Sequence, residues 1–460
     1  MKKFFTLVIM LLLVVAVTFG IAYGIRGGEI SSVSDGTSVG DFSAEGSSNS
    51  GVPSQDESDE GSRIPEKQVY SFLACGDNIM HTSVLFGAVE NYAEVNGTSP
   101  DYSSMKDADY DFDRIYHNIE DIVASADLSY INQETLVGGG RVGSYPTFCS
   151  PDAIGEKVKE LGFDIVNLAH NHMFDSYNSD SLVYADNFFR SHGLDTIGYI
   201  SDEDDSENIT VVTVGDVKIA FLAYTEWLNG LSPASGETTV PPMLSDTELI
   251  RRQVTLAKSM ADLVFVSCHW GAEDNSTATD QVFDYNYPRN QQYVELFLEL
   301  NVDVIIGMHS HVIETCEWRT RADGGRTFIA YSLGNLVSGM YWGRNMLGAM
   351  LTLDIVDDNG DIYVENPKLI PTVMHYVKGN KVSSSQSDIT GADTGFRKNE
   401  IFLLEDYTEE LAAAHGCHAK DDASFSSSHR FTLNNLYKRV LNTIPEEFLP
   451  ESIVAHGYQD

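Results

Sequence analysis

The sequence predicts a layered α/β domain with mixed sheets, on three observations. From residue 68 onward, apolar runs of strand length alternate with stretches of helical spacing, as in layered α/β domains. Two pairs of these runs are joined by tight turns, at Gly215-Asp216 and at Asp358-Asn359-Gly360, which predicts antiparallel hairpins within the sheets. Hydrophobic residues make up 42% of the 460 residues, so most of the chain can bury a core.

The elements of the first half follow from apolar spacing and from boundary residues. VYSFLACGD at 69–77 is a strongly apolar run and predicts a strand. It is followed in order by a helix at 111–126, a strand at 126–134, a helix at 151–162, a strand at 163–169 and a helix at 178–192. The helix at 151–162 is the best delimited, because Pro151 stands at its start and Gly162 at its end.

The second half continues the same alternation. NITVVTVGDVKIAFLAYTE at 208–226 predicts two strands around the Gly215-Asp216 turn. Then come a helix at 245–260, a strand at 261–271, a helix at 290–300, strands at 302–311 and 327–335, and a hairpin within 348–371. Residues after about 380 are less regular, apart from apolar spacing at 431–444 that predicts a terminal helix.

The chain divides into four predicted regions. Lys2 and Lys3 precede an uncharged run, residues 4–25, that is long enough to span a bilayer. We therefore expect residues 1–26 to be a transmembrane anchor or uncleaved signal, with a cleaved signal as the alternative. The lysines favour a cytoplasmic N-terminus, which predicts a single-pass protein of the cell membrane with its bulk outside the cell. Residues 27–67 predict a disordered acidic linker, 68–375 the main domain and 376–460 a C-terminal extension.

Charge and cysteine usage exclude some classes of protein. The formal net charge of −39 repels phosphates, so we expect no nucleic acid partner. The five cysteines form no C-x-x-C pair, which argues against a zinc ribbon. Their odd number argues against a full disulfide framework and leaves a single bridge open.

Five of the strand-like runs end in imidazole, carboxamide or carboxylate groups. These groups, in chain order, are Asp77 and His81, Asn132 and Glu134, His170, Asn171 and His172, His269 and Glu273, and His309 and His311. Ligand sites in open α/β sheets lie beyond the carboxyl ends of the strands. If the five ends meet, they form a cluster of nitrogen and oxygen donors.

Such a cluster suits divalent metal ions. Neutral imidazoles and carboxylates bind Mn, Fe or Zn, with geometry selecting among them. The number of donors exceeds what one tetrahedral ion needs, so we expect two ions about 3.5–4 Å apart. Glu134 is the expected bridge between the ions, which would polarise an ester, phosphoryl or amide oxygen.

Each residue taken alone also fits a plainer role. A histidine at a strand end is commonly a hydrogen-bonded core residue. Asp77 fits a turn or a helix cap, Asn132 fits a partner for loop backbone, and Glu273 fits a surface carboxylate. Asp175 fits either a helix cap or a carboxylate that orients a neighbouring histidine. The metal hypothesis therefore rests on the occurrence of such residues at all five strand ends.

Six segments together resemble the poly-γ-glutamate capsule biosynthesis (CapA-type) family, which is similar in fold to the calcineurin-like metallophosphatases. They are CGDNIMH (75–81), NQE (132–134), NLAHNH (167–172), HWGAE (269–273), GMHSH (307–311) and YSLGN (331–335). The segments follow the family's order and span roughly residues 69 to 340. Each segment alone is weak, and the combination is specific. His170 and Met308 depart from the residues common in the family and leave the substrate class open.

The resemblance implies a layered β sandwich flanked by helices, of the calcineurin-like metallophosphatase type, with two metal ions. It implies that Asp77 and His311 ligate one ion, that Asn171, His269 and His309 ligate the other, and that Glu134 bridges them. His172 would be the catalytic proton donor. His81 is a further candidate ligand, and Asn132, His170 and Glu273 remain additional site candidates.

Two functions fit this resemblance. The first is a metal-dependent hydrolase of phosphoester or γ-glutamyl amide bonds. The second is a non-catalytic metal-binding component for assembly or export of an anionic polymer. The implied partners are the membrane, through the N-terminal helix, an anionic polymer or a small phosphoester or peptide, and a polymer ligase with export components. Only the hydrolase requires an open metal position and turnover.

Overall fold

The computed structural model describes residues 67–273, 282–419 and 431–459, and Arg63–Asp460 form one compact unit. The predicted anchor at 1–26 and all but one residue of the predicted linker lie outside the described residues. Within the described ranges, no helix combines the length and the apolar character needed to cross a bilayer. We therefore correct the prediction of a single-pass membrane protein, since no described helix supports it. The longest of these helices, α7 (Val282–Glu299), carries Arg289, Glu295 and Glu299 along its length.

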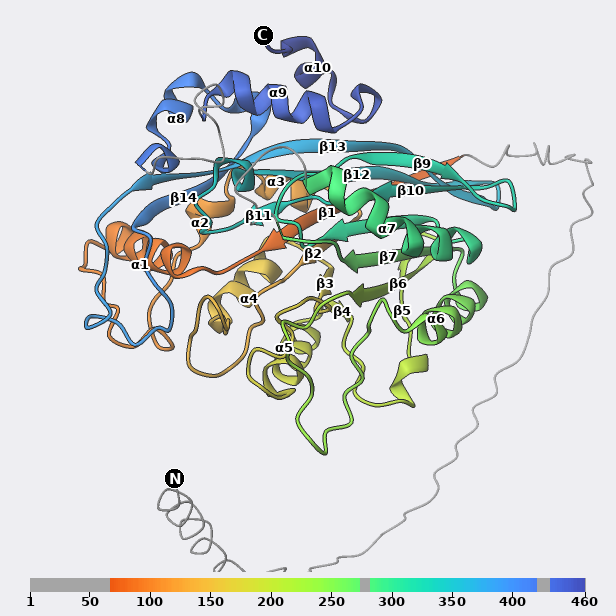
Figure 1. The fold of residues 1–460 in the computed structure, drawn as a ribbon, viewed down its shortest axis with the longest axis horizontal. Coiled ribbons are helices and arrows are strands. Elements are labelled where there is room, and N and C mark those ends of the chain that lie inside the picture. Colours follow the sequence, from red (N-terminus) through yellow and green to blue (C-terminus); the bar gives the residue numbers. More distant parts are fainter. Residues whose placement is uncertain (1–66, 274–281, 420–430, 460) are drawn as a thin grey trace, which may run out of the picture. The chain divides into compact units, whose positions relative to one another are not determined.

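Two mixed sheets build the domain (Figure 1). The first has eight strands, in the spatial order β14 (Phe396–Leu403), β13 (Asp361–Lys378), β12 (Leu347–Asp358), β1 (Gln68–Asn78), β2 (Leu128–Asn132), β3 (Ile165–Asn167) and β4 (Asp195–Ile197), with β11 (Asn335–Val337) beside β1. The second has six, in the order β5 (Thr210–Val214), β6 (Val217–Thr225), β7 (Leu263–His269), β8 (Val304–Met308), β10 (Arg326–Ala330) and β9 (Cys316–Thr320). Both contain parallel and antiparallel pairs, which confirms the predicted layered α/β class with mixed sheets.

The two sheets pack face to face through aromatic side chains. The ring of Phe72 on β1 lies 5.2 Å from that of Phe265 on β7, edge to face. The hydroxyls of Tyr130 on β2 and Ser267 on β7 lie 2.7 Å apart. Alternate residues of a strand point to opposite faces, so His269 lies on the same face of β7 as Phe265 and points toward the first sheet.

Ten helices within the described ranges flank the sheets (Figure 1). They are α1 (Thr82–Asn96), α2 (Asp113–Tyr116), α3 (Glu120–Ala124), α4 (Asp152–Glu160), α5 (Asp180–Ser191), α6 (Thr247–Met260), α7, α8 (Glu409–Ala414), α9 (Leu433–Thr443) and α10 (Glu451–His456). Helices α6 and α7 cover the outer face of the second sheet, where Val254 and Phe297 share a core with Val266 of β7. The five cysteines all lie in the described ranges, and none of them forms a disulfide.

Two helical regions in the first half of the domain differ from the expected elements. The single helix predicted at 111–126 is divided into α2 and α3. Between them Asn118 donates its side-chain N–H to the carbonyl of Ile401 at 2.8 Å, which ties the turn to β14. The other difference is α1, which the sequence did not predict. Its first eight residues are all buried, so they show none of the alternation that marks a surface helix.

The parallel strands of each sheet end at one place. Asp77 is in register with Asn132, and Asn132 with Asn167, across β1, β2 and β3. In the second sheet His269 at the end of β7 is in register with Met308 at the end of β8. The packing of the sheets brings these carboxyl ends together.

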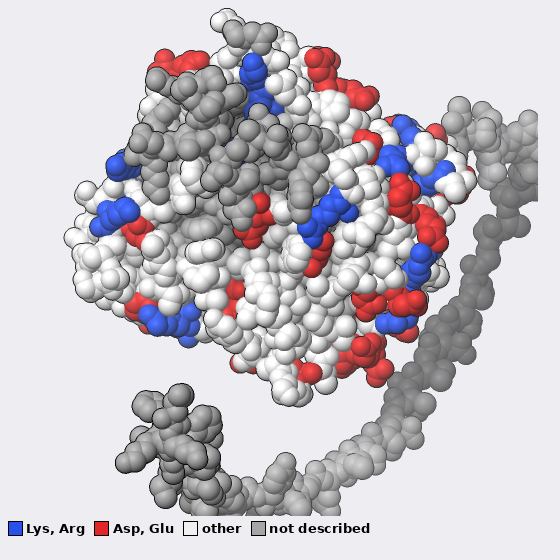
Figure 2. Space-filling view, viewed as in Figure 1, with Lys and Arg blue, Asp and Glu red and all other residues white. Residues whose placement is uncertain are grey.

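Charge is spread over the surface of the domain. Figure 2 shows acidic side chains distributed over one face, with lysines and arginines between them. The described lysines and arginines visible in this view form no extended basic patch of the kind that binds a phosphate backbone.

Buried His375 predicts an acid-sensitive fold. Its Nδ1 lies 2.7 Å from the hydroxyl of Tyr407, and burial lowers its pKa to about 4. Its pKa in the unfolded chain is about 6.5, so the unfolded state binds more protons between pH 6.5 and 4. The free energy of unfolding therefore falls by up to roughly 3 kcal/mol as the pH drops from 6.5 to 4.

We expect His375→Gln, which does not titrate, to lose less stability than the wild type between pH 7 and pH 4.5. Urea unfolding at both pH values measures this. His192→Gln, at an exposed histidine, is the matched control and should keep the wild-type pH dependence. An unchanged dependence in His375→Gln would contradict the assignment.

Candidate metal centre

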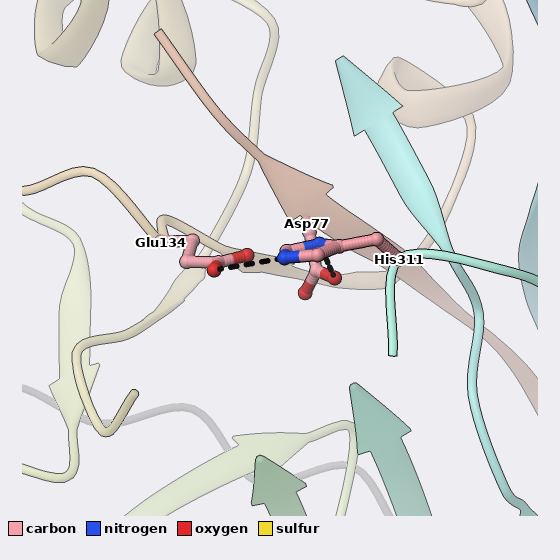
Figure 3. A group of neighbouring side chains, drawn as sticks. All are labelled: Asp77, Glu134 and His311. Atoms are coloured by element: carbon pink, nitrogen blue, oxygen red, sulfur yellow. Dashed lines mark ion pairs between the residues drawn. The ribbon is translucent and has the colours of Figure 1, made fainter. Parts of the chain in front are cut away.

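Asp77, Glu134 and His311 form the first donor group (Figure 3). One donor atom from each lies within 4.8 Å of the others, and all three side chains are buried. His311 Nδ1 lies 3.2 Å from Asp77 Oδ2, and His311 Nε2 lies 3.8 Å from Glu134 Oε1. Two carboxylates and an imidazole are suitable ligands for a divalent first-row metal ion.

Close backbone packing places Asp77. The amide N–H of Asp77 donates to the carbonyl of Gly334 at 2.9 Å. A Cβ on Gly76 would lie only 2.0 Å from the same carbonyl oxygen, so this approach of β1 to the following segment requires glycine. The side chain of Asp77 is then fixed by Asn132, whose Nδ2 donates to Asp77 Oδ1 at 2.7 Å.

Asn335 orients His311. Asn335 Nδ2 donates to the carbonyls of His311 and Asn345 at 3.3 and 3.1 Å, so its Oδ1 is the atom that faces His311. That oxygen lies 3.1 Å from His311 Nδ1. Both Asn335 and Asp77 offer acceptor oxygens to Nδ1, so in the neutral imidazole of His311 the proton lies on Nδ1. The unprotonated Nε2 then faces Glu134.

Asn171, His269 and His309 form the second donor group. His269 Nε2 lies 3.0 Å from Asn171 Oδ1 and 3.0 Å from His309 Nδ1. Burial, then the charge of neighbouring histidines, lowers the pKa of His269 and His309 well below the usual value. Both imidazoles are therefore neutral, which is the form that binds metal.

Glu134 joins the two groups. Its Oε1 lies 3.8 Å from His311 Nε2 and also 3.8 Å from His269 Nε2. Neither carboxylate oxygen has a hydrogen-bond partner, although both are fully buried. Burial, then the charge of Asp77, raises its pKa well above the usual value, while His311 opposes this rise. A buried carboxylate without partners is costly unless a cation satisfies it, so these residues fit a bound metal.

Opposing effects determine the charge of His311. Burial lowers its pKa, but the charge of Glu134 and the hydrogen bond to Asp77 outweigh burial and raise the pKa to about 10. In the absence of a metal ion, the imidazolium therefore compensates part of the negative charge of the two carboxylates.

The backbone at His309 and His311 has positive φ values, +95° and +59°. Residues other than glycine rarely adopt this region, and such conformations cluster at functional sites. The GMHSH segment thus turns two imidazoles toward the two donor groups within three residues. In the same segment, a Cβ on Gly307 would lie 2.0 Å from the carbonyl oxygen of Tyr331, so a larger residue is excluded there.

His172 lies beside the second group and is held by a carboxylate. Its Nδ1 lies 2.7 Å from Asp175 Oδ2, which also accepts the amide N–H of Phe148 at 2.6 Å. The ring of Phe148 packs edge to face on that of His172, with centroids 4.7 Å apart. Because Nδ1 is engaged by Asp175, Nε2 is the ring nitrogen of His172 that can exchange a proton.

Three other predicted site residues already have protein partners. His170 Nδ1 accepts the amide N–H of His172 at 3.2 Å within the loop. Asn132 uses both polar atoms, donating to Asp77 and accepting from Asn167 at 2.7 Å. His81 Nδ1 accepts the amide N–H of Gly339 at 3.1 Å, and burial, then the charges of His311 and His172, lowers its pKa to about 3.

Glu273 lies at the mouth of the site. Its charge raises the pKa of both Glu134 and His311, and it lines a cavity with His81 and His311. Its side chain is partly exposed, unlike those of the two donor groups.

Sequence reasoning missed Asn167 and Asn229. Asn167 ends β3 as Asn132 ends β2, and this equivalence was a usable signal. Asn229 lies in a loop after β6, with a φ of +53°. It accepts the Nδ2 N–H of Asn171 at 3.2 Å, and its own Nδ2 lies 3.4 Å from His172 Nδ1. Nothing in the local pattern marks Asn229, because its role depends on two residues of the loop that follows β3.

Comparison with known proteins gives a family match. Residues 71–340 match the model of the family described as "Bacterial capsule synthesis protein PGA_cap". The chain is 27% identical over 289 residues to the capsule biosynthesis protein CapA of Bacillus anthracis, covering 61% of this chain and 62% of that protein. It is 30% identical over 195 residues to the PGA biosynthesis protein CapA of Bacillus subtilis, covering 42% and 47%. The chain thus spans less than two thirds of either relative.

Among solved structures, the chain is similar to the calcineurin-like phosphoesterase YfkN of Bacillus subtilis. The TM-score is 0.34 at 14% identity, covering 66% of this chain and 91% of that one. This similarity is too low to assign an activity.

Proposed function

Because the chain belongs to the bacterial capsule synthesis protein PGA_cap family, we propose that it is a metal-dependent hydrolase of capsule biosynthesis. The proposed centre holds two divalent ions, Mn, Fe or Zn, at the two donor groups described above. The proposed substrates contain a phosphoester or a γ-glutamyl amide bond. The two relatives are named for capsule biosynthesis and for PGA biosynthesis, which supports a role in that process.

The position of Glu134 carries the proposal. Its carboxylate lies at equal distance from an imidazole of each donor group, and it is buried without a hydrogen-bond partner. A structural role in a metal-free core would leave both oxygens unsatisfied at a cost of several kcal/mol, in order of magnitude. A shared ligand between two cations satisfies both oxygens at once.

The residues around the groups fit hydrolysis. When bound, divalent ions supply Lewis acidity toward the phosphoryl or carbonyl oxygen of the bond to be cleaved. His172, oriented by Asp175, holds a proton at Nε2 that it can give to the leaving group. Neutral His269 and His309 and the carboxylates of Asp77 and Glu134 would hold such ions in place.

A non-catalytic role in assembly or export of an anionic polymer is the alternative. The net charge of −39 makes direct binding of a polyanion unfavourable unless cations bridge the two, which gives the metal centre a use without turnover. A polymer ligase and export components are the partners proposed for either role.

Turnover separates the two functions. We expect the purified protein to cleave at least one member of a panel of nitrophenyl phosphoesters and γ-glutamyl peptides. A chelator should abolish cleavage, and Mn, Fe or Zn should restore it. Bound metal without turnover on any member would favour the polymer-handling role.

Asn229 provides a test of the second donor group. Its side chain holds the Nδ2 of Asn171, which keeps Oδ1 of Asn171 directed at His269. We expect Asn229→Ala to weaken metal binding about 10–100-fold, the usual effect of removing a residue that orients a ligand. Calorimetric metal titration measures this. Asn208→Ala, at an exposed loop asparagine, should bind metal like the wild type, and equal affinities in both variants would contradict the assignment.

A further inference from the structure

A cavity of about 350 Å³ adjoins the metal centre. His311 and His81 form its inner wall, and Tyr145, Met340 and Trp342 are among its outer lining. This volume is at the lower end for small-molecule sites, so it has room for the end group of a chain and not for a folded partner.

The described lining is largely apolar and aromatic, and it contains one carboxylate. Tyr145, Tyr341 and Trp342 contribute three aromatic rings, with those of Tyr341 and Trp342 4.8 Å apart. Glu273 lines the same cavity. Among the described residues, no hydrogen bond or ion pair reaches the Glu273 side chain, and no lysine or arginine lines the cavity.

We propose that this cavity binds a protonated amine of the substrate, next to the bond that the metal centre cleaves. This inference rests on the proposed hydrolase function and adds a substrate class to it. Aromatic rings together with a carboxylate are the groups that recognise ammonium ions. A carboxylate or phosphate in the cavity would instead be repelled by the carboxylate of Glu273.

The charges behind the cavity do not reverse this preference. The two ring nitrogens of His311 are directed at Asp77 and Glu134, at 3.2 and 3.8 Å, and not at the cavity. Glu273 thus remains the carboxylate of the described lining that faces a bound group. The substrate would then be cleaved beside an amine-bearing end, so an interior polyanionic segment would be a poor substrate.

Binding of small probes to the chelator-treated full chain tests the inference. n-Butylammonium, n-butanol and pentanoate are compared by saturation-transfer NMR at pH 7. We expect n-butylammonium to bind best and pentanoate worst. In Glu273→Gln, which preserves shape, the affinity for n-butylammonium should fall about tenfold or more, while that for n-butanol stays unchanged. Glu156→Gln, at an exposed carboxylate of α4, should bind all three like the wild type.

Any one of four results would overturn the inference. They are equal binding of n-butanol and n-butylammonium, preference for pentanoate, absence of any binding, and an unchanged preference in Glu273→Gln. Because no metal ion takes part, such a result leaves metal-dependent turnover untouched. Conversely, ammonium binding in a protein without turnover would retain the cavity assignment and reject the hydrolase.

Discussion

Glu134→Gln is expected to lower the metal content from about two ions per chain to one or fewer and to reduce turnover by about 10³-fold or more. The substitution keeps the shape of the side chain and removes the charge that both donor groups share. In the metal-free state the same variant should be more stable than the wild type. The neutral carboxamide avoids the burial of a carboxylate whose oxygens have no hydrogen-bond partner and its repulsion from Asp77, and these two effects outweigh the attraction of His311.

Elemental mass spectrometry, steady-state kinetics and urea unfolding in the presence of a chelator measure the three effects. Glu156→Gln controls for the loss of one negative charge at an exposed position and should change none of them. A Glu134→Gln variant that retains two ions and full activity would remove the bridging role. If metal-free Glu134→Gln is less stable than the metal-free wild type, Glu134 has a stabilising partner within the protein instead.

His172→Gln is expected to reduce turnover by about 10²–10⁴-fold and to leave the metal content at about two ions per chain. His172 belongs to neither donor group, and its Nδ1 is held by Asp175, so its loss removes a proton donor and not a ligand.

The leaving group provides the sharper readout for this variant. A nitrophenolate leaves without a proton, so the loss of turnover should be small with a nitrophenyl ester and large with an alkyl ester. Equal losses on the two esters would contradict proton donation by His172. A fall in metal content would make His172 a ligand. Asp175→Asn should show a weaker form of the same dependence, because it disturbs the orientation of the imidazole alone.

Much of the fold was predictable because its strands are apolar and sharply bounded. The runs that became β6, β7 and β8, and the second half of β1, are almost wholly buried, and such runs stand out from any surrounding sequence. Helix α1 was not predictable from periodicity, because its first half is buried on all sides. Strand β14, with the sequence FRKNEIFL, lies at a sheet edge and has too many polar residues to read as a strand.

The donor residues of the centre were predictable for a related reason. A polar residue directly after a buried strand is conspicuous, and parallel strands deliver their ends to one edge. The residues that orient these donors were harder to find, since Asn229 and Asn335 act through contacts between segments distant in sequence. No sequence pattern links Tyr145 of the cavity with the neighbouring pair Tyr341 and Trp342, because they come from separate loops.

The metal content of the purified chain tests the central claim most directly. After incubation with Mn, Zn and Fe and removal of excess ions, elemental mass spectrometry should find about two ions per chain. The Asn171→Ala variant should then retain about one ion, because only the second donor group is disrupted. A wild-type chain that binds no metal under these conditions would contradict the two-ion centre and the hydrolase built on it.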